Sequence, residues 1–425
     1  MSSYKIIGGK PLKGEITPSG NKNAALPILA ASLLTDEKVI LENVPKIRDV
    51  RVQLRILKSL GTKIRYSKGN RITLKTPRIK TYKLSKEDVS KSRGSILFIG
   101  PLIGRVGKAE IWAPGGCKLG KRPIDNYFFS LEKLNAKLKF DGKYILNGRK
   151  LKGTRIWQEE TSVTGTENLI IASVLAEGET EIINAASEPH VQDLCRFLNK
   201  MGAKITGIGT NVLHIRGVNK LHGCTYRISD DFMEIGTLIA AAAVTGGEIQ
   251  INTNIQKYMD KILMEFVKLG VKVEKNEKGL FVSRKQKMKI RNYIDGTMNK
   301  IECLPWPGFP PDLLQFMIVV ATQCKGKILI FDKMYEGRLF FTEDMNKMKA
   351  DIVMCDPHRV IVHGPSELEG KVLQSPDIRA GMAFLLAALA AEGESIIERG
   401  EIIERGYEDI DGKFRKLGGK IKKIK

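Results

Sequence analysis

One sequence pattern recurs six times along the chain, about 70 residues apart. Each copy runs from a small or glycine residue through a short alternating strand, a loop and an amphipathic helix to a closing phrase of the type Leu-Gly-x-Lys-Ile. The closing positions are Gly61, Asn135, Gly202, Gly270, Lys349 and Gly418. A period of this length is too long for a solenoid, so the pattern predicts six small βα modules.

An apolar, helix-like run precedes the strand of each module. The six runs cover residues 23–34, 94–103, 168–176, 235–244, 313–321 and 381–390. A helix that is apolar on every side must be buried on every side. We therefore expect helices to fill the centre and sheets to form the outside. A chain of 425 residues is too long for one ordinary core, which predicts two similar α/β domains of three modules each.

Composition narrows the class of protein further. The longest apolar run, residues 381–391, is too short to span a bilayer. The N-terminus lacks the basic-then-apolar pattern of a signal peptide. The six cysteines are widely scattered without a CxxC spacing. These features argue against a disulfide scaffold or a zinc site and predict a cytoplasmic protein.

The net charge of +23 allows three interpretations: nucleic-acid binding, a highly phosphorylated substrate, or a lysine-rich proteome. The cations are spread along the chain, and no RNP, KH or C2H2 pattern accompanies them. Solvated strand and helix faces are therefore favoured over a nucleic-acid footprint.

The loop from Ala113 to Asp125 concentrates reactive residue types. It places Cys117 among three glycines and the cations Lys118, Lys121 and Arg122. Nearby positive charge favours thiolate over thiol. The loop is therefore either a site of acid–base or covalent work on an anionic substrate, or a basic surface loop with an incidental cysteine.

Cations at the entrances of the apolar helices also need an explanation. Helix capping accounts for the Ser, Thr, Asp and Asn residues found there. It does not account for Lys22, Arg93 or Arg379, because a cation is unfavourable at the positive end of a helix. Arg338 and Arg405 follow strands at the loop position that Cys117 occupies in its own module. Several arginines at equivalent positions predict a multiply anionic ligand.

Five motifs in this order resemble the enolpyruvyl transferases over essentially the whole chain. The motifs are residues 19–27 (SGNKNAALP), 114–123 (PGGCKLGKRP), 307–312 (PGFPPD), 377–379 (DIR) and 405–407 (RGY). The resemblance implies a two-domain inside-out α/β barrel built from six βα units, three per domain. It implies one domain of residues 21–229, a discontinuous one of residues 1–20 plus 230–425, and an active site in the cleft between them.

Within the family, the motifs are closest to the branch that acts on UDP-N-acetylglucosamine. The resemblance then implies transfer of the enolpyruvyl group of phosphoenolpyruvate to the sugar 3-hydroxyl with release of phosphate. This addition–elimination through a tetrahedral intermediate is the first committed step of peptidoglycan synthesis. No cofactor, metal, nucleic acid or membrane is expected, and the chain is expected to be a monomer.

The resemblance also assigns roles to residues. Cys117 would protonate the vinyl carbon and form a covalent adduct with phosphoenolpyruvate, and Asp312 would deprotonate the sugar hydroxyl; Lys22 and Arg405 join them as catalytic residues. Phosphoenolpyruvate would contact Lys22, Asn23, Arg122, Arg338, Arg379 and Arg405. The sugar nucleotide would contact Asn23, Arg93, Arg122, Pro123, Ile124, Asp125, Asn126, Tyr127, Glu160, Thr161, Ser162, Val163, Asp312 and Met334. Asp377 is a further matched position.

Three alternatives remain open at this point. The branch that acts on 3-phosphoshikimate lacks the Pro-Gly-Gly-Cys loop. RNA 3′-phosphate cyclases share related βα repeats but depend on a histidine near the C-terminus, whereas the last histidine here is His363. An inactive homologue is the third. The chain also departs from the usual pattern: Tyr127 stands where many relatives have histidine, and Thr164-Gly165 replaces a more usual Gly-Ala. Gly337 replaces a polar residue before Arg338, and Ile378 stands where leucine is usual.

Overall fold

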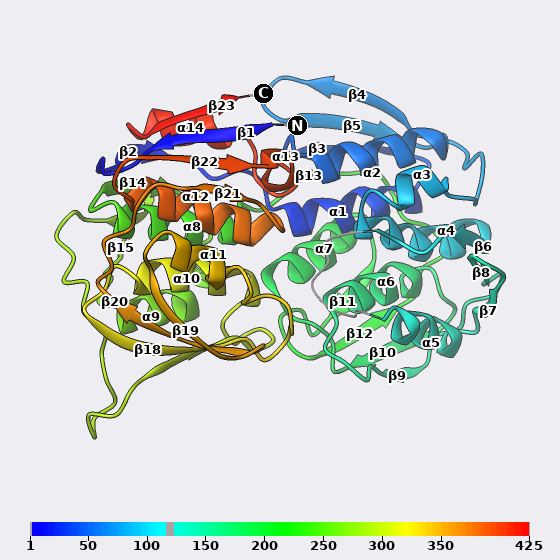
Figure 1. Ribbon diagram of the computed structural model, residues 1–425. Coiled ribbons are helices and arrows are strands. Elements are labelled where there is room, and N and C mark those ends of the chain that lie inside the picture. Colours follow the sequence, from blue (N-terminus) through cyan, green and yellow to red (C-terminus); the bar gives the residue numbers. More distant parts are fainter. Residues whose placement is uncertain (1, 116–122, 425) are drawn as a thin grey trace. The chain divides into compact units, whose positions relative to one another are not determined.

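The computed structural model describes residues 2–115 and 123–424 (Figure 1). These residues form two compact units. The N-terminal unit consists of residues 20–115 and 123–229, and the C-terminal unit of residues 2–19 and 230–424. Cys117 and Arg122, two of the expected site residues, lie outside the described residues.

The described strands of the N-terminal unit pair into three sheets, with the orders β13-β3-β5-β4, β6-β8-β7 and β11-β12-β10-β9. The bounds are β3 (Lys38–Glu42), β4 (Lys63–Ser67), β5 (Arg71–Lys75), β6 (Lys108–Ile111), β7 (Lys137–Phe140), β8 (Tyr144–Asn147), β9 (Arg155–Trp157), β10 (Glu179–Ile183), β11 (Lys204–Thr206), β12 (Val212–Arg216) and β13 (Thr225–Arg227). The helices are α1 (Lys22–Ala31), η1 (Ser32–Leu34), α2 (Arg48–Ser59), α3 (Lys86–Val89), η2 (Arg93–Phe98), α4 (Ile99–Val106), α5 (Asp125–Lys133), α6 (Val163–Ser173) and α7 (Pro189–Lys200).

The described strands of the C-terminal unit also pair into three sheets, β21-β22-β1-β23, β15-β16-β14-β2 and β17-β18-β20-β19. The bounds are β1 (Ser3–Ile7), β2 (Lys13–Ile16), β14 (Glu248–Asn252), β15 (Glu274–Asn276), β16 (Gly279–Val282), β17 (Lys300–Glu302), β18 (Gly326–Phe331), β19 (Asp351–Asp356), β20 (Arg359–Gly364), β21 (Val372–Gln374), β22 (Glu394–Glu398) and β23 (Lys420–Ile424). The helices are α8 (Phe232–Val244), η3 (Gln256–Tyr258), α9 (Asp260–Lys268), η4 (Pro311–Leu313), α10 (Leu314–Ala321), α11 (Thr342–Lys347), α12 (Ile378–Ala390), α13 (Gly400–Ile403) and α14 (Ile410–Lys416).

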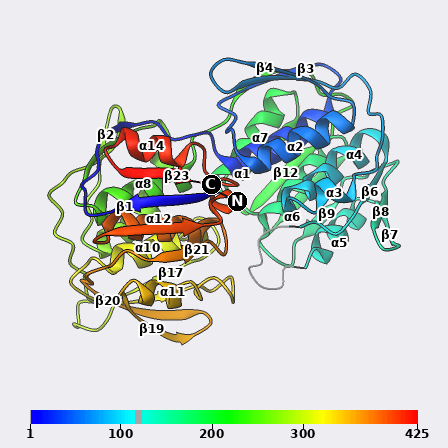
Figure 2. The ribbon, with the colours of Figure 1, turned by 45° about the horizontal axis from the view of Figure 1, so that its top comes forward.

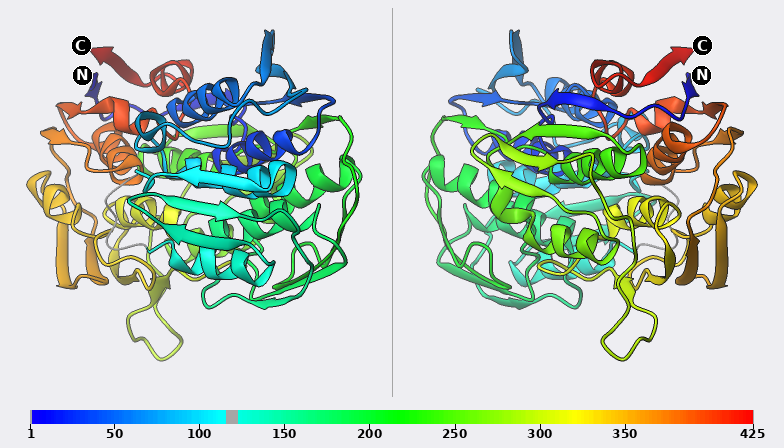
Figure 3. Two further views of the ribbon diagram at one scale, coloured as in Figure 1. Left: turned by 90° about the vertical axis from the view of Figure 1, so that its right-hand side faces the viewer. Right: turned by 90° about the vertical axis from the view of Figure 1, so that its left-hand side faces the viewer.

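The two ends of the chain meet in one sheet. β1 pairs antiparallel with both β22 and β23, so the N-terminal strand is held on both edges. Figure 2 shows these strands side by side, and α12 packs beneath β1 and β22. Within the same unit, the segment between β16 and β17 projects as a long loop (Figure 3).

Helices occupy the centre of each unit, as the apolar runs predicted. In the C-terminal unit α8, α10 and α12 pack against one another, and every residue of α8 is buried. The sheets are buried on one face only: in β14 and β22, for example, each buried residue alternates with a more exposed one. This alternation is the pattern of a sheet that covers a helical core with one face and meets water with the other. The six sheets of the described residues, three in each unit, confirm the expectation of six modules.

The expected helix over residues 94–103 is not a single α-helix. It consists of the 3-10 helix η2 followed by α4, which starts at Ile99. Proline lacks a backbone N–H, and in the first turn of an α-helix no intrahelical hydrogen bond is lost by that. By starting at Ile99, α4 places Pro101 in that first turn.

Candidate active site

Two arginines of the C-terminal unit, Arg338 and Arg379, converge on one carboxylate, that of Asp312. Arg338 Nη1 donates to Asp312 Oδ1 at 2.8 Å. Arg379 donates from Nε to Asp312 Oδ2 at 3.0 Å, and its Nη2 lies 2.9 Å from the same oxygen. Three segments supply these residues: η4 carries Asp312, the loop after β18 carries Arg338, and the first turn of α12 carries Arg379. We call the Arg338–Arg379 pair the arginine clamp.

The charges of the clamp control the acidity of Asp312. Burial by itself would raise the pKa of this carboxyl, but the positive charges of Arg379 and Arg338 and their hydrogen bonds hold the pKa well below its usual range. Asp312 is therefore ionised at neutral pH. While it is held in this way, it is also a weak base.

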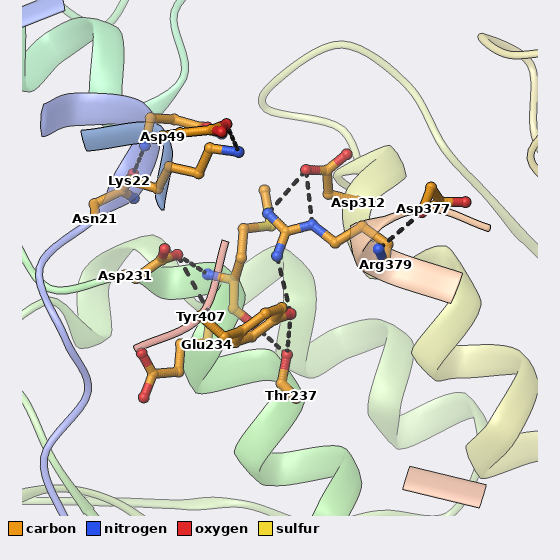
Figure 4. A network of polar contacts seen from close by, with 12 residues as sticks. Asn21, Lys22, Asp49, Asp231, Glu234, Thr237, Asp312, Asp377, Arg379 and Tyr407 are labelled. Atoms are coloured by element: carbon orange, nitrogen blue, oxygen red, sulfur yellow. Dashed lines mark hydrogen bonds and ion pairs between the residues drawn. The ribbon is translucent and has the colours of Figure 1, made fainter. Parts of the chain in front are cut away.

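Arg379 is anchored on its other side by Tyr407. Arg379 Nη1 donates to the Tyr407 hydroxyl at 2.9 Å, and the guanidinium carbon lies 5.3 Å from the centroid of the Tyr407 ring. The Tyr407 hydroxyl also lies 2.9 Å from Thr237 Oγ1 on α8 (Figure 4). Burial raises the pKa of Tyr407 to about 12, although the charge of Arg379 works in the opposite direction. The phenol is therefore neutral at physiological pH.

Arg338 has its own anchors. Its guanidinium carbon lies 4.3 Å from the centroid of the Tyr335 ring, and its Nε lies 3.6 Å from Asp332 Oδ2. Asp332 is fully buried, and its Oδ1 accepts hydrogen bonds from the backbone N–H groups of Met334 and Tyr335 and from the thiol of Cys303. These contacts fix the loop that carries Arg338.

Asp377, a matched position in the sequence, is the N-cap of α12. Its Oδ1 accepts from the backbone N–H of Arg379 at 2.8 Å and of Ala380 at 3.1 Å. Asn21 caps α1 and Asp231 caps α8 in the same manner. The Asp377 carboxylate places a negative charge at the N-terminus of α12, and the Asp312 carboxylate places a second negative charge beside Arg379. These two carboxylates offset the cost of a cation at that position.

In the N-terminal unit, Lys22 occupies the first turn of α1 and pairs with a buried carboxylate. Lys22 Nζ lies 2.9 Å from Asp49 Oδ2, and the two side chains are 14% and 4% exposed (Figure 4). Asp49 lies in the first turn of α2, where a negative charge is favourable. Like the arginine clamp, Lys22 is thus paired with a carboxylate of its own unit.

The residues expected to hold a nucleotide lie at the starts of two helices of the N-terminal unit. Asp125 is the first residue of α5, Val163 is the first residue of α6, and Ser162 caps α6 by accepting from the Gly165 N–H at 3.3 Å. Tyr127 on α5 is linked to Arg93, whose Nη2 lies 3.4 Å from the phenol oxygen. Thr161 Oγ1 donates to Asn184 Oδ1 at 2.6 Å.

The structure therefore brings some of the expected residues into contact, namely Asp312 with Arg338 and Arg379, and Arg93 with Tyr127. Arg405 lies in the turn after α13, two residues before Tyr407, and Met334 lies in the loop that carries Arg338. Within the set, the Tyr127 N–H also donates to the Ile124 carbonyl at 3.1 Å, and the Ser162 N–H donates to the Glu160 carbonyl at 2.7 Å. Lys22 and Asn23 begin α1, and Pro123 and Asn126 lie at the start of α5.

Sequence reasoning missed four residues that hold the site together: Asp49, Thr237, Asp332 and Tyr407. Tyr407 belongs to a matched motif, but its role as the anchor of Arg379 had no signal of its own. Asp49 and Asp332 could not be found from the sequence, because only the fold shows that their carboxylates are buried. Their partners lie 27 and 6 residues away in the sequence, so spacing alone does not connect them.

Among residues 2–115 and 123–424, no group of three or more His, Cys, Asp or Glu side chains is arranged to hold a metal ion. In the same part of the chain, no helix is long and apolar enough to cross a membrane.

The six sheets and the largely buried cations paired with carboxylates, together with the match below, place the chain among α/β enzymes. The family model for EPSP synthase (3-phosphoshikimate 1-carboxyvinyltransferase) matches residues 6–414. The chain belongs to this family of enolpyruvyl transferases.

Curated relatives match the chain end to end. The protein of Borrelia garinii subsp. bavariensis is 49% identical over 426 residues, which cover 100% of both chains. The protein of Treponema denticola is 47% identical over 421 residues, which cover 99% of both. Both are named UDP-N-acetylglucosamine 1-carboxyvinyltransferase.

Solved structures confirm the fold class. The enolpyruvyl transferase NikO from Streptomyces tendae superposes with a TM-score of 0.88 at 20% identity, covering 100% of this chain and 99% of the other. EPSP synthase from Acinetobacter baumannii superposes with a TM-score of 0.77 at 16% identity over 100% of both chains.

Proposed function

We propose that this protein transfers the enolpyruvyl group of phosphoenolpyruvate to the 3-hydroxyl of UDP-N-acetylglucosamine and releases phosphate. The relatives that match the chain from end to end at up to 49% identity carry the name of this activity. The reaction begins peptidoglycan synthesis, so the protein acts in building the cell wall. We place it in the cytoplasm as a monomer that needs no metal or cofactor.

One observation supports this function above the others: Arg338 and Arg379 converge on a carboxylate, with 2.8 and 3.0 Å hydrogen bonds. Phosphoenolpyruvate carries a carboxylate and a phosphate, and arginine forks match the geometry of both groups. We assign the carboxylate to Arg379 and Arg405, with Arg338 beside them, and the phosphate to Lys22 and Arg122.

The reaction consists of an addition and an elimination. In the addition, the 3-hydroxyl oxygen bonds to C2 of phosphoenolpyruvate, its proton passes to Asp312, and the Cys117 thiol gives a proton to C3. In the elimination, phosphate leaves C2 and a proton leaves the C3 methyl group, which restores the double bond. Lys22 and Arg122 stabilise the charge that develops on the departing phosphate.

The sugar nucleotide is assigned to the starts of α5 and α6. Exposed backbone N–H groups at a helix N-terminus bind anions, and polar side chains gather there. Residues 123–127 and 160–163, together with Asn23, Arg93 and Arg122, form the proposed set, and Asp312 and Met334 contact the sugar.

The direct test is phosphate release by the purified chain with phosphoenolpyruvate and UDP-N-acetylglucosamine. We expect release only when both substrates are present, with the enolpyruvyl sugar nucleotide as the second product. Shikimate 3-phosphate in place of the sugar nucleotide separates this function from that of the family's other branch. Phosphate release with phosphoenolpyruvate and shikimate 3-phosphate, but not with phosphoenolpyruvate and UDP-N-acetylglucosamine, would contradict the proposal.

Asp312→Asn tests the base within the same assay. The amide keeps the size of the side chain but does not accept a proton, so we expect turnover to fall at least about a hundredfold, the scale of general-base catalysis. Binding of UDP-N-acetylglucosamine is expected to change by less than about threefold, since one hydrogen bond of many is altered. Unchanged turnover would remove Asp312 from the mechanism.

A further inference from the structure

Both arginines of the clamp have contacts besides those with Asp312. Arg338 stacks on Tyr335 and faces the buried carboxylate of Asp332, while Arg379 donates to Tyr407 and stacks on its ring. The side chains of Arg338 and Arg379 are only 2% and 9% exposed. Both guanidinium groups are therefore also oriented by contacts that do not involve the carboxylate between them.

Asp312 is the most exposed of the three side chains in the ion-pair cluster. Its side chain is 28% exposed, far more than either arginine. It lies in η4, a 3-10 helix of three residues. The clamp holds both of its oxygens, Oδ1 through Arg338 and Oδ2 through Arg379. A small rotation of this side chain toward solvent would vacate the clamp.

The part of Asp312 that the clamp contacts is the carboxylate group. The contacts are N–H···O bonds to the two oxygens, and any small carboxylate accepts the same bonds. Phosphoenolpyruvate carries a carboxylate on C2, the carbon to which the sugar hydroxyl adds. The side chain and the substrate therefore present the same chemical group to the same pair of arginines.

We propose that Asp312 is the resting occupant of the arginine clamp and that the carboxylate of phosphoenolpyruvate displaces it. The inference rests on the proposed function for the identity of the incoming carboxylate. The displaced Asp312 leaves both cations, regains its affinity for a proton and becomes able to accept the proton of the sugar hydroxyl. Asp312 can therefore act as a base only when phosphoenolpyruvate is bound. When the sugar nucleotide binds without phosphoenolpyruvate, Asp312 is still paired with the two arginines.

The first experiment asks whether the clamp accepts an outside carboxylate. Asp312→Ala empties the clamp, and sodium acetate is compared with sodium chloride at the same ionic strength by thermal unfolding. We expect acetate to raise the Tm of the variant by about 3 °C or more, because a ligand that binds only the folded state stabilises it. The wild-type Tm is expected to differ between the two salts by less than about 1 °C, since its clamp is filled.

The control for charge is Asp377→Asn. This substitution removes a carboxylate beside Arg379 but leaves Asp312 in the clamp, and asparagine is an equally good helix cap. Acetate should affect this variant no more than the wild type. An equal acetate effect in all three proteins, or none in Asp312→Ala, would overturn the proposal. If Asp312→Ala is partly unfolded in chloride, the same comparison becomes recovery of the folded state by acetate.

The second experiment measures phosphoenolpyruvate binding by calorimetry without sugar nucleotide. An internal occupant lowers apparent affinity by the fraction of time that it fills the site, so we expect Asp312→Ala to bind about tenfold more tightly than the wild type. Asp377→Asn is expected to gain less than about threefold, through charge alone. Equal or weaker binding by Asp312→Ala would show that Asp312 organises the clamp rather than competes for it.

These measurements separate the inference from the proposed function. If wild-type protein released no phosphate from the two substrates, the proposed function would fail, whereas the acetate test would still report on the clamp. If phosphate release occurred but acetate had no specific effect on Asp312→Ala, only the displacement would fail.

Discussion

Arg379 donates a hydrogen bond to the Tyr407 hydroxyl, and Thr237 fixes where the proton of that hydroxyl points. Thr237 donates its hydroxyl proton to the carbonyl of Met233 at 2.9 Å, so its oxygen accepts from Tyr407. The Tyr407 oxygen is then left to accept from Arg379 at 2.9 Å. This chain runs from α12 to α8 and orients the guanidinium that we assign to the substrate carboxylate.

Tyr407→Phe removes the acceptor while keeping the ring on which Arg379 stacks. We expect the KM for phosphoenolpyruvate to rise about tenfold, the equivalent of one hydrogen bond to a charged group, with kcat within about threefold of wild type. Steady-state kinetics with phosphoenolpyruvate varied gives both constants. Tyr293→Phe, at an exposed position of the same unit, is the matched control. A fall in kcat alone would contradict a positioning role.

Cys117 lies outside the described residues, and its predicted role as an acid is testable by chemistry. Cys117→Asp should retain activity and resist alkylation by an epoxide, because a carboxylic acid still donates a proton. Cys117→Ser should lose at least about a hundredfold in turnover, since a hydroxyl is a far poorer acid. Phosphate release measures both variants. Normal turnover by the serine variant would show that the thiol is not the acid.

The other cysteines supply an internal control for this experiment. Cys195, Cys303 and Cys324 are buried, and burial raises the pKa of each thiol to about 12. Cys355 is exposed. Because the thiolate is the reactive form, mass spectrometry after brief treatment with iodoacetamide should find label on Cys355 and none on the three buried residues.

Gly165 and Tyr127 both depart from the usual family pattern, and the Tyr127 ring lies next to the Cα of Gly165. A Cβ added at Gly165 would lie 3.0 Å from Cδ1 of Tyr127, closer than a methyl group is normally tolerated. We expect Gly165→Ala to weaken UDP-N-acetylglucosamine binding about fivefold or more, through displacement of the ring. Tyr127→His should relieve the clash, so the double variant is expected to bind better than Gly165→Ala alone. Calorimetry measures the affinity of the wild type, both single variants and the double variant for UDP-N-acetylglucosamine. If the two substitutions changed the binding free energy additively, the two residues would not be coupled.

Glu167 is a buried carboxyl on α6 whose Oε1 has no hydrogen-bond partner among the described residues. Burial raises its pKa well above the usual value, and the charge of Glu188 adds to the effect. The folded state therefore holds this proton more tightly than the unfolded state, so its contribution to stability is complete at low pH and is lost as pH rises toward the folded-state pKa.

Glu167→Gln should remove the loss of stability that the ionisation of Glu167 causes as pH rises. We expect the variant and the wild type to have similar Tm near pH 4.5, and the variant to be more stable by about 2–4 °C at pH 8, the shift that one kcal/mol produces in a domain of this size. Thermal unfolding across this pH range measures the difference, with the exposed Glu132→Gln as control. A Tm difference that does not grow with pH would contradict the prediction.

Local chemistry in the sequence determined most of the fold. Apolar runs with no polar face could only be core helices, and the structure buries α8 and α12 accordingly. Cap residues such as Asn21, Asp231 and Asp377 begin the helices where sequence rules place them, because a cap bonds to backbone N–H groups within three residues. The motifs likewise include Lys22, Asp312 and Arg379, since residue types and their order are local information.

Only the tertiary structure decided which charges meet. Asp312 and Arg379 are 67 residues apart, and Lys22 and Asp49 are 27 apart, so no periodicity relates them. Pairing across such distances depends on how sheets and helices pack, and a buried ion must find its counter-charge there because leaving water unpaired is costly. The sequence therefore named Asp312 as a base, whereas the fold shows it held by two arginines, a state that its neighbours in the chain could not reveal.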